Sequence, residues 1–286
     1  MSDFVQALRS GQVLLMDGAM GTEMRRLLRA PRVECGELYN VSNPALVQAI
    51  HRSHLDAGAD VLLTNSFQAN PVALERRGRA AQFHDIWQAA IGLARLDHPR
   101  AHFVLADVGP IENLTTKIAV NILDECVGVD GVLLETWSSF EDLKRFADRP
   151  KVRLLVSFTF QRTHDLVTIH GAAPETCAKK ARQYGAVALG ANCGKEIGMD
   201  DMREIVQRYH DACDLPIFVR PNAGTPKRGL RFPRGPETMA AALPELLEEG
   251  VAMIGGCCGT TPEHIRVFRA VVDMWNARVK PSPERC

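Results

Sequence analysis

AMIGGCCGTTPEHIRVFRAVVDMW, residues 252–275, contains a short apolar run, a glycine-rich turn and a long helical pattern. The apolar run at 252–256 predicts a strand covered on both faces, because parallel strands lack the alternation of half-exposed strands. Pro262 marks the start of the helix, since proline is favoured in the first helical turn. The stretch therefore predicts one strand–helix unit.

The same order recurs along the chain. Further strands are expected at 13–16, 61–65, 102–106, 131–135, 153–160, 186–191 and 216–220. Helical patterns occupy about 43–57, 71–96, 115–126, 139–148, 174–184, 200–213 and 236–249. Eight such units predict an α/β protein with a (β/α)8 TIM barrel, and a doubly wound open sheet is the alternative. We expect one barrel domain over residues 1–286, with a short polar tail at about 277–286.

Length and charge narrow the functional classes. The 286 residues suit a barrel, which typically needs about 250. The 34 Lys and Arg residues balance 34 Asp and Glu residues, which argues against a nucleic-acid partner, because phosphate backbones attract basic surfaces. No apolar run reaches the roughly 20 residues that cross a membrane, and residues 1–12 lack a signal-peptide core. These patterns predict a cytoplasmic protein with no membrane partner.

Cysteines gather where a barrel enzyme keeps its active site, at the carboxyl ends of strands. Cys193 follows the sixth expected strand, and Cys257 and Cys258 follow the eighth between glycines that permit a sharp turn. Three thiolates suit Zn²⁺ and leave its fourth position for a substrate. Burial as small apolar residues is the alternative, and it is preferred for the remaining internal cysteines. These are Cys35, Cys126, Cys177 and Cys213.

Five motifs carry a family resemblance across residues 17–265. They are DGAMGTEM (17–24), AGADVLLTNSFQAN (57–70), GANCG (190–194), RPNAG (220–224) and IGGCCGTTPEHI (254–265). Together they resemble the homocysteine S-methyltransferase family, and most of all the homocysteine-binding module of cobalamin-dependent methionine synthase. The resemblance implies a barrel with one zinc ion, ligated by Cys193, Cys257 and Cys258, with the homocysteine sulfur as fourth ligand. Zinc keeps such a thiol deprotonated, so the sulfur can attack a methyl group without a general base.

The resemblance also implies substrate contacts. Asp17 and Glu135 match the acids that receive the ammonium group of homocysteine. The backbone from Gly18 through Ala19 to Gly21 is expected to meet its carboxylate. Plausible orienting groups are Thr64, Asn65 and Asn222. Independently of the family, Asp17–Gly18 is also typical of a turn, whereas a charged residue such as Glu135 at the end of an apolar strand is rarely buried without a partner.

The sequence is compatible with more than one methyl donor. The motifs favour a methyl-corrinoid supplied in trans by a corrinoid-carrying protein, because 286 residues leave no room for folate and cobalamin modules. A small onium donor, betaine or S-methylmethionine, is the alternative, and Trp137 could meet such a cation or simply pack. The short segment from Asp107 to Glu135 would leave the zinc more open and permits a third possibility, a zinc- and homocysteine-binding subunit inactive on its own. A zinc hydrolase is disfavoured, since its ligands are typically nitrogen or oxygen.

Overall fold

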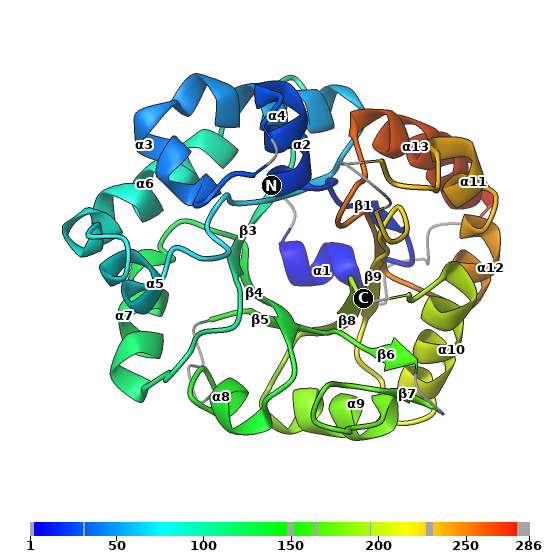
Figure 1. The fold of residues 1–286 in the computed structure, drawn as a ribbon. Coiled ribbons are helices and arrows are strands. Elements are labelled where there is room, and N and C mark those ends of the chain that lie inside the picture. The colour runs from blue at the N-terminus through cyan, green and yellow to red at the C-terminus, as the bar shows by residue number, and fades with distance from the viewer. Residues whose placement is uncertain are drawn as a thin grey trace.

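A closed ring of parallel strands forms the centre of the molecule (Figure 1). The computed structural model describes residues 3–30, 32–147, 152–162, 165–194, 196–226 and 231–278. Eight strands form one sheet in the order β1-β10-β9-β8-β5-β4-β3-β2, and a bridge between Met16 and Val61 joins its two edges. The predicted (β/α)8 barrel is confirmed, and the open sheet is excluded. The strands are β1 (Leu14–Leu15), β2 (Val61–Leu63), β3 (Phe103–Val108), β4 (Gly131–Trp137), β5 (Leu154–Phe158), β8 (Ala188–Asn192), β9 (Ile217–Arg220) and β10 (Met253–Ile254).

Helices surround the ring (Figure 1). The 3-10 helices are η1 (Gly36–Leu38) and η2 (Ala80–Gln82). The α-helices are α1 (Phe4–Leu8), α2 (Met20–Leu28), α3 (Tyr39–Ser42), α4 (Pro44–Asp56), α5 (Pro71–Glu75), α6 (Phe83–Ala94), α7 (Thr116–Glu125), α8 (Phe140–Lys144), α9 (Pro174–Gln183), α10 (Met199–His210), α11 (Pro236–Ala240), α12 (Leu243–Glu248) and α13 (Pro262–Arg278). None of the helices in the described ranges is long and apolar enough to span a membrane.

Two of the expected helices are each interrupted in the structure. The stretch 71–96 divides into α5, η2 and α6, because the chain turns at Gly78, whose φ is +65°. The stretch 236–249 divides into α11 and α12, because Pro244 has no N–H to continue a helical ladder. The expected tail also begins later, since α13 continues to Arg278, and residues 279–286 lie outside the described part.

Some elements were not expected. Among them are α1, α2 and a two-stranded antiparallel hairpin, β6 (Gln161–Arg162) and β7 (Leu166–Val167), inserted between β5 and α9. Helix α1 lies across the amino ends of the strands, where Phe4 packs against Phe103 with ring centroids 5.2 Å apart. Phe4 and Leu8 belong to the apolar cluster that fills the barrel interior. The barrel is therefore plugged at its amino end.

The barrel interior changes from apolar to polar toward the carboxyl ends of the strands. Leu105 on β3 and Leu133 on β4 belong to the apolar interior cluster. Side chains two residues apart in a strand share a face, so Asp107 and Glu135 form the next interior layer. The same step along β5 and β9 adds Ser157 and Arg220, and Asn192 at the end of β8 pairs in register with Arg220. This buried polar layer is the floor of the candidate site.

Candidate functional site

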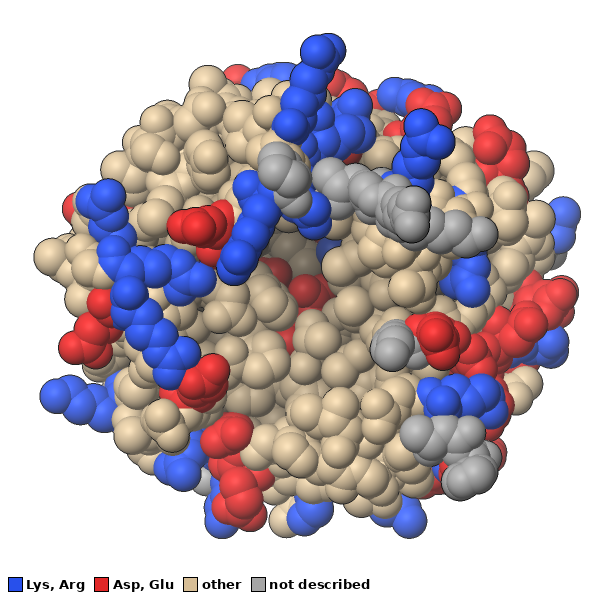
Figure 2. Space-filling view, in the orientation of Figure 1, with Lys and Arg blue, Asp and Glu red and all other residues tan. Residues whose placement is uncertain are grey.

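The carboxyl end of the barrel is hollowed, and acidic side chains lie at the bottom of the hollow (Figure 2). Buried acids near the strand ends are Asp17, Asp107 and Glu135. A single buried cation, Arg220 at the end of β9, accompanies them in this layer. The site therefore combines a cysteine cluster with a cluster of buried charges.

The three cysteines expected to bind metal converge. The Sγ atoms of Cys193, Cys257 and Cys258 all lie within 4.8 Å of one another. Zn–S bonds of about 2.3 Å in tetrahedral geometry place sulfurs about 3.8 Å apart. The limit of 4.8 Å is compatible with that geometry, so the donor atoms and their spacing fit Zn²⁺. The remaining free cysteines of the described chain do not join a metal-binding group.

Backbone turns bring these sulfurs together. Cys193 has a φ of +57° and Gly194 a φ of +91°, so the chain reverses directly after β8. A Cβ atom on Gly194 would lie 2.6 Å from the carbonyl oxygen of Phe160, so only glycine fits there. The amide of Cys257 donates to the carbonyl of Pro221 at 2.9 Å, which anchors the loop after β10 to the loop after β9. The cluster is thus positioned by backbone geometry.

Amide side chains contact the sulfurs. Asn222 Nδ2 lies 3.4 Å from Cys193 Sγ and 3.3 Å from the carbonyl oxygen of Gly194. Asn192 Nδ2 lies 3.9 Å from Cys257 Sγ and 3.1 Å from Thr136 Oγ1. An N–H directed at sulfur stabilises the thiolate form and orients it. Asn222 is one of the predicted orienting residues, and Asn192 is an additional residue of this kind that its motif did not indicate.

The three neighbouring thiols change one another's pKa values. Hydrogen bonds from the Cys257 and Cys258 thiols lower the pKa of Cys193. The hydrogen bond with Cys193 in turn raises the pKa of Cys257 and of Cys258. A divalent cation at the cluster favours the deprotonated form of all three sulfurs.

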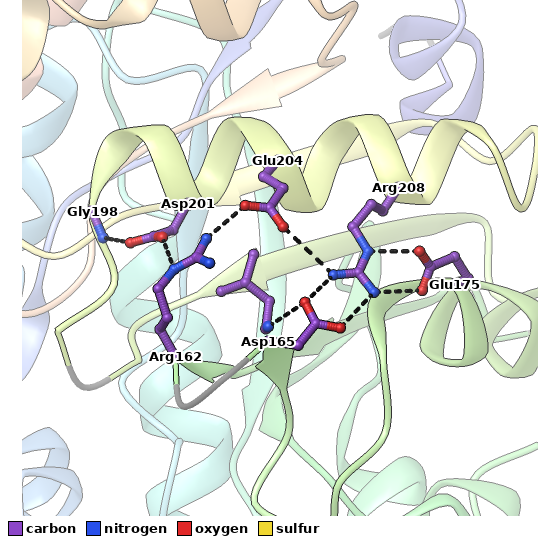
Figure 3. Close-up of polar contacts among 8 residues, drawn as sticks. Arg162, Asp165, Glu175, Gly198, Asp201, Glu204 and Arg208 are labelled. Carbon is purple, nitrogen blue, oxygen red and sulfur yellow. Dashed lines mark hydrogen bonds and ion pairs between the residues drawn. The ribbon is translucent and has the colours of Figure 1, made fainter.

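An ion-pair network supports the chain segment that follows Cys193 (Figure 3). Arg162 on β6 reaches Asp201 at 2.5 Å and Glu204 at 2.6 Å, both on α10. Asp201 also accepts from the Gly198 amide at 2.6 Å, at the start of that helix. Farther along α10, Arg208 pairs with Asp165 at 2.7 Å and with Glu175 at 2.6 Å. The network links the β6–β7 hairpin and α9 to α10, which is the helix that follows the Cys193 loop along the chain.

Buried charges contact one another beside the cysteines. Arg220 donates to Asp17 Oδ1 at 2.8 Å, and its Nε lies 3.3 Å from Glu135 Oε1. The second oxygen of Asp17 accepts from the Leu63 amide at 2.9 Å. Asp107 Oδ1 is buried and has no hydrogen-bond partner. Burial raises the pKa of Asp107 and of Glu135.

The remaining expected substrate contacts have internal partners. The Ala19 amide donates to Thr260 Oγ1 at 3.2 Å, and the Gly18 carbonyl accepts from Arg220 at 3.5 Å. Thr64 Oγ1 lies 2.6 Å from Ser66 Oγ and accepts from the Asp107 amide. The Asn65 amide donates to Gly36 O and Asn40 Oδ1, so it secures the segment around η1. Thr64 and Asn65 shape the loop after β2 through these bonds.

Trp137 packs in the structure. It is 1% exposed, its Nε1 donates to the Val108 carbonyl at 2.9 Å, and its ring meets Phe146 edge-on with centroids 5.5 Å apart. The packing role is therefore favoured over contact with a cationic donor.

Sequence reasoning missed Arg220 and Asp107 as members of the site. Both stand at strand ends, in RPNAG and in the run from His102 to Asp107. Their signal was a charged residue that ends an apolar strand, the same signal that identified Glu135.

Comparisons with known proteins agree with this geometry. A family model described as homocysteine S-methyltransferase matches residues 14–272. The methionine synthase of Mycobacterium leprae (strain TN) is 29% identical, over 99% of this chain and 26% of the relative. That of Mycobacterium tuberculosis (strain ATCC 25618 / H37Rv) is 30% identical, over 96% of this chain and 25% of the relative. The chain thus spans about a quarter of the length of these relatives.

Solved structures show the same fold. The metallated form of the homocysteine methyltransferase MmuM from Escherichia coli superposes with a TM-score of 0.75 and 26% identity, covering 91% of this chain and 96% of that chain. A methyltransferase from Methanosarcina mazei, 13% identical with a TM-score of 0.61, covers 96% of this chain and 98% of its own and shows the fold alone.

Proposed function

Because the chain belongs to the homocysteine S-methyltransferase family, we propose that it transfers a methyl group to the thiol of homocysteine and forms methionine. One observation carries this proposal: three cysteine sulfurs converge within 4.8 Å at the carboxyl end of a barrel, next to a layer of buried charges. The sulfurs suit a thiol-activating metal, and the charges suit the amino-acid part of the substrate. We take residues 1–286 as one barrel domain for this activity.

The metal we propose is Zn²⁺, held by Cys193, Cys257 and Cys258. When bound, it supplies a Lewis acid that favours the thiolate form of a coordinated substrate sulfur. Asn222 and Asn192 direct their amide N–H groups at the cysteine sulfurs, so they limit the movement of these ligands. The reaction forms a sulfur–carbon bond and breaks the bond between the methyl carbon and the donor, which leaves with the electron pair. The thiol proton is lost before transfer, so no residue has to act as a base at the methyl carbon.

The amino-acid part of homocysteine has matching groups nearby. Its carboxylate would meet the backbone at Gly18–Gly21, where α2 begins at Met20 and no side chain caps its first turn. The helix dipole and the free N–H groups of such a turn favour an anion. Its ammonium group would meet the buried acids of the polar layer, among them Asp17 and Glu135.

For the donor we propose a methyl-corrinoid, brought by a separate corrinoid-carrying protein. The likeness to two methionine synthases along nearly the whole of this chain supports this choice. A small onium donor is the second candidate. The likeness to the MmuM homocysteine methyltransferase favours it, since that protein is covered over 96% of its length by this barrel alone.

A donor panel tests the reaction. The purified, reduced and zinc-loaded chain is incubated with homocysteine and one donor at a time, and methionine is quantified. The donors are betaine, S-methylmethionine, S-adenosylmethionine, methyltetrahydrofolate and methylcobalamin. Methionine from methylcobalamin alone supports a corrinoid donor, and methionine from an onium compound supports the second candidate. Absence of methionine with every donor contradicts the proposed activity of the chain by itself and favours a homocysteine-binding subunit.

Removal of one cysteine tests the metal. Cys257→Ala is expected to lose bound zinc and methyl transfer together, because two sulfurs cannot complete the site. Zinc content is measured by elemental analysis beside activity. Cys126→Ser is the matched control, since Cys126 lies at the end of α7, does not belong to the sulfur cluster, and donates its thiol hydrogen to the Ile122 carbonyl. A Cys257→Ala protein with a full equivalent of zinc and normal turnover would show that the metal lies elsewhere.

A further inference from the structure

Thr260 is a fully buried residue that links two loops of the candidate site. It lies between Cys257 and the start of α13 at Pro262. Its hydroxyl donates to the Cys257 carbonyl at 2.8 Å and accepts from the Ala19 amide at 3.2 Å. A threonine hydroxyl has one donor hydrogen, so that hydrogen is used on the loop after β10, while the oxygen accepts from the loop after β1.

Two glycines make room for the Thr260 side chain. A Cβ atom on Gly18 would lie 3.0 Å from Thr260 Oγ1, and a Cβ atom on Gly256 would lie 2.6 Å from Thr260 Cγ2. The side chain therefore fits closely against the backbone of both loops, and a closely packed group transmits a change in position to its neighbours.

Further hydrogen bonds hold the same two loops together. Strands β1 and β10 pair in parallel, and the ladder continues beyond them, since the Gly256 amide donates to the Asp17 carbonyl at 3.0 Å. Farther along both loops, the Gly259 amide donates to Thr22 Oγ1 at 3.0 Å, and Thr22 lies in the first turn of α2. The start of α2 is thus tied to the loop that carries the cysteine pair.

The Thr260 hydroxyl is not used to cap α13. The Thr261 amide donates to His264 Nδ1 at 3.2 Å instead. Both hydrogen-bond partners of the Thr260 hydroxyl, Cys257 and Ala19, precede the first residue of that helix. The hydroxyl therefore contributes to the relative position of the two loops.

We propose that Thr260 is a positioning residue that fixes the distance between the cysteine sulfurs and the start of α2, and thereby selects the chain length of the amino thiol. The inference rests on the proposed function and deepens it, because the sulfur of that substrate would lie at the cysteines and its carboxylate at the backbone of Gly18–Gly21. Since Thr260 is buried, it acts on the substrate through Cys257 and Ala19.

A fixed separation discriminates between thiols of different length. Homocysteine has one methylene more than cysteine, which changes the reach from sulfur to carboxylate by at most about 1.5 Å. One methylene is worth about 10- to 200-fold in specificity in a site of fixed dimensions, and a displacement of about 1 Å can cost about 100-fold in rate. Loss of the Thr260 hydrogen bonds would let the two loops shift relative to each other, so the preference for one length should fall.

The test separates the hydroxyl of Thr260 from its shape. Thr260→Val keeps the branched shape and removes both hydrogen bonds, whereas Thr260→Ser keeps the hydroxyl and removes the methyl group. Dissociation constants of homocysteine and cysteine are measured by calorimetry on the zinc-loaded proteins, and the ratio of the two constants is the readout. We expect Thr260→Val to lower the preference for homocysteine by about tenfold or more. Thr260→Ser should keep it within about threefold of the wild type, because its hydroxyl can make the same bonds.

Two further variants control for folding, and zinc content and the thermal midpoint are measured on each protein. Thr168→Val is the matched control, since Thr168 is a buried threonine whose hydroxyl accepts from the Ala172 amide at 3.1 Å in the turn after β7. Its ratio of dissociation constants should equal that of the wild type. Thr22→Val removes the hydrogen bond from the Gly259 amide at a half-buried position. It should shift the ratio in the same direction as Thr260→Val, and it carries the test if Thr260→Val does not fold.

The outcomes distinguish the two proposals. An unchanged ratio in Thr260→Val and Thr22→Val, whether or not the affinities fall, overturns the positioning role while methyl transfer to homocysteine still stands. An equal loss of preference in Thr260→Ser and Thr260→Val assigns the effect to packing and overturns the role of the hydroxyl. A wild-type chain that prefers cysteine contradicts homocysteine as the substrate, and a ratio that still shifts in Thr260→Val supports the positioning role. A wild-type chain that binds neither thiol overturns both.

Discussion

Replacement of Arg220 by methionine is expected to destabilise the fold strongly. The guanidinium is 4% exposed and lies 2.8 Å from Asp17 and 3.3 Å from Glu135. At an effective dielectric constant of about 20, these contacts amount to about 6 and about 5 kcal/mol of Coulomb attraction. Desolvation offsets most of this gain, so the measurable quantity is the loss when one partner is removed, about 3–5 kcal/mol for a buried pair.

The variant leaves the acids without their cation. Methionine fills much of the same volume, so a cavity contributes little, and the cost comes from uncompensated charge on Asp17 and Glu135. At about 2–4 °C per kcal/mol for a chain of this size, the unfolding midpoint should fall by about 6–20 °C. Thermal and urea unfolding are followed by circular dichroism at pH 7 with the same zinc content in every sample.

A double-mutant cycle isolates the ion pair. Asp17→Asn in the Arg220→Met background keeps an acceptor for the Leu63 amide and removes one orphaned charge, so it should recover about 2 kcal/mol. If Arg220→Met lost less than about 1 kcal/mol, or if the costs of the two substitutions simply added, the buried pair would not be the stabilising contact inferred here.

Two further predictions follow from local geometry and titration. Gly194→Ala should lower the free energy of unfolding by about 1–3 kcal/mol, because the new Cβ atom would meet Phe160 O and Ile197. The same variant should also lose zinc more readily in a competition with a chelator. Gly185→Ala is the control, since Gly185 has a φ of +75° and open space around it, so this variant should show backbone strain without the effect on zinc. Burial lowers the pKa of His51 to about 4 from 6.5, so the unfolded chain binds more protons and stability is lost as pH falls through this window. Between pH 7 and pH 4.5 the wild type should lose about 2–3 kcal/mol more than His51→Asn in urea titrations, and parallel pH curves for the two proteins would contradict neutral burial of His51.

The barrel and the three cysteines were predictable because their signals are local. Apolar runs such as 252–256 mark strands covered on both faces, and helix starts such as Pro262 follow from backbone chemistry within a few residues. The glycines around Cys257 and Cys258 indicate a turn for the same reason. Eight repeats of one unit then leave few arrangements in which every strand is covered.

Helix boundaries inside long apolar patterns were less predictable. The pattern from Pro71 to Leu96 continues through Gly78, and only the fold shows that the chain turns there to enter η2 and α6. The pattern from Pro236 to Glu249 likewise hides the break at Pro244. Periodicity reports which face is apolar, and it persists when a helix bends or restarts over the same core.

What only the tertiary structure decided is how the buried charges are paired. Asp17, Asp107, Glu135 and Arg220 come from four separate strands, and nothing in their spacing along the chain states which acid faces the guanidinium. Closure of the barrel places Asp17 at 2.8 Å from Arg220 and leaves Asp107 Oδ1 without a partner. Sequence by itself determined the elements and the residue types at their ends, since these depend on neighbours in the chain. The pairing depends on distances between strands, which exist only after the ring has closed.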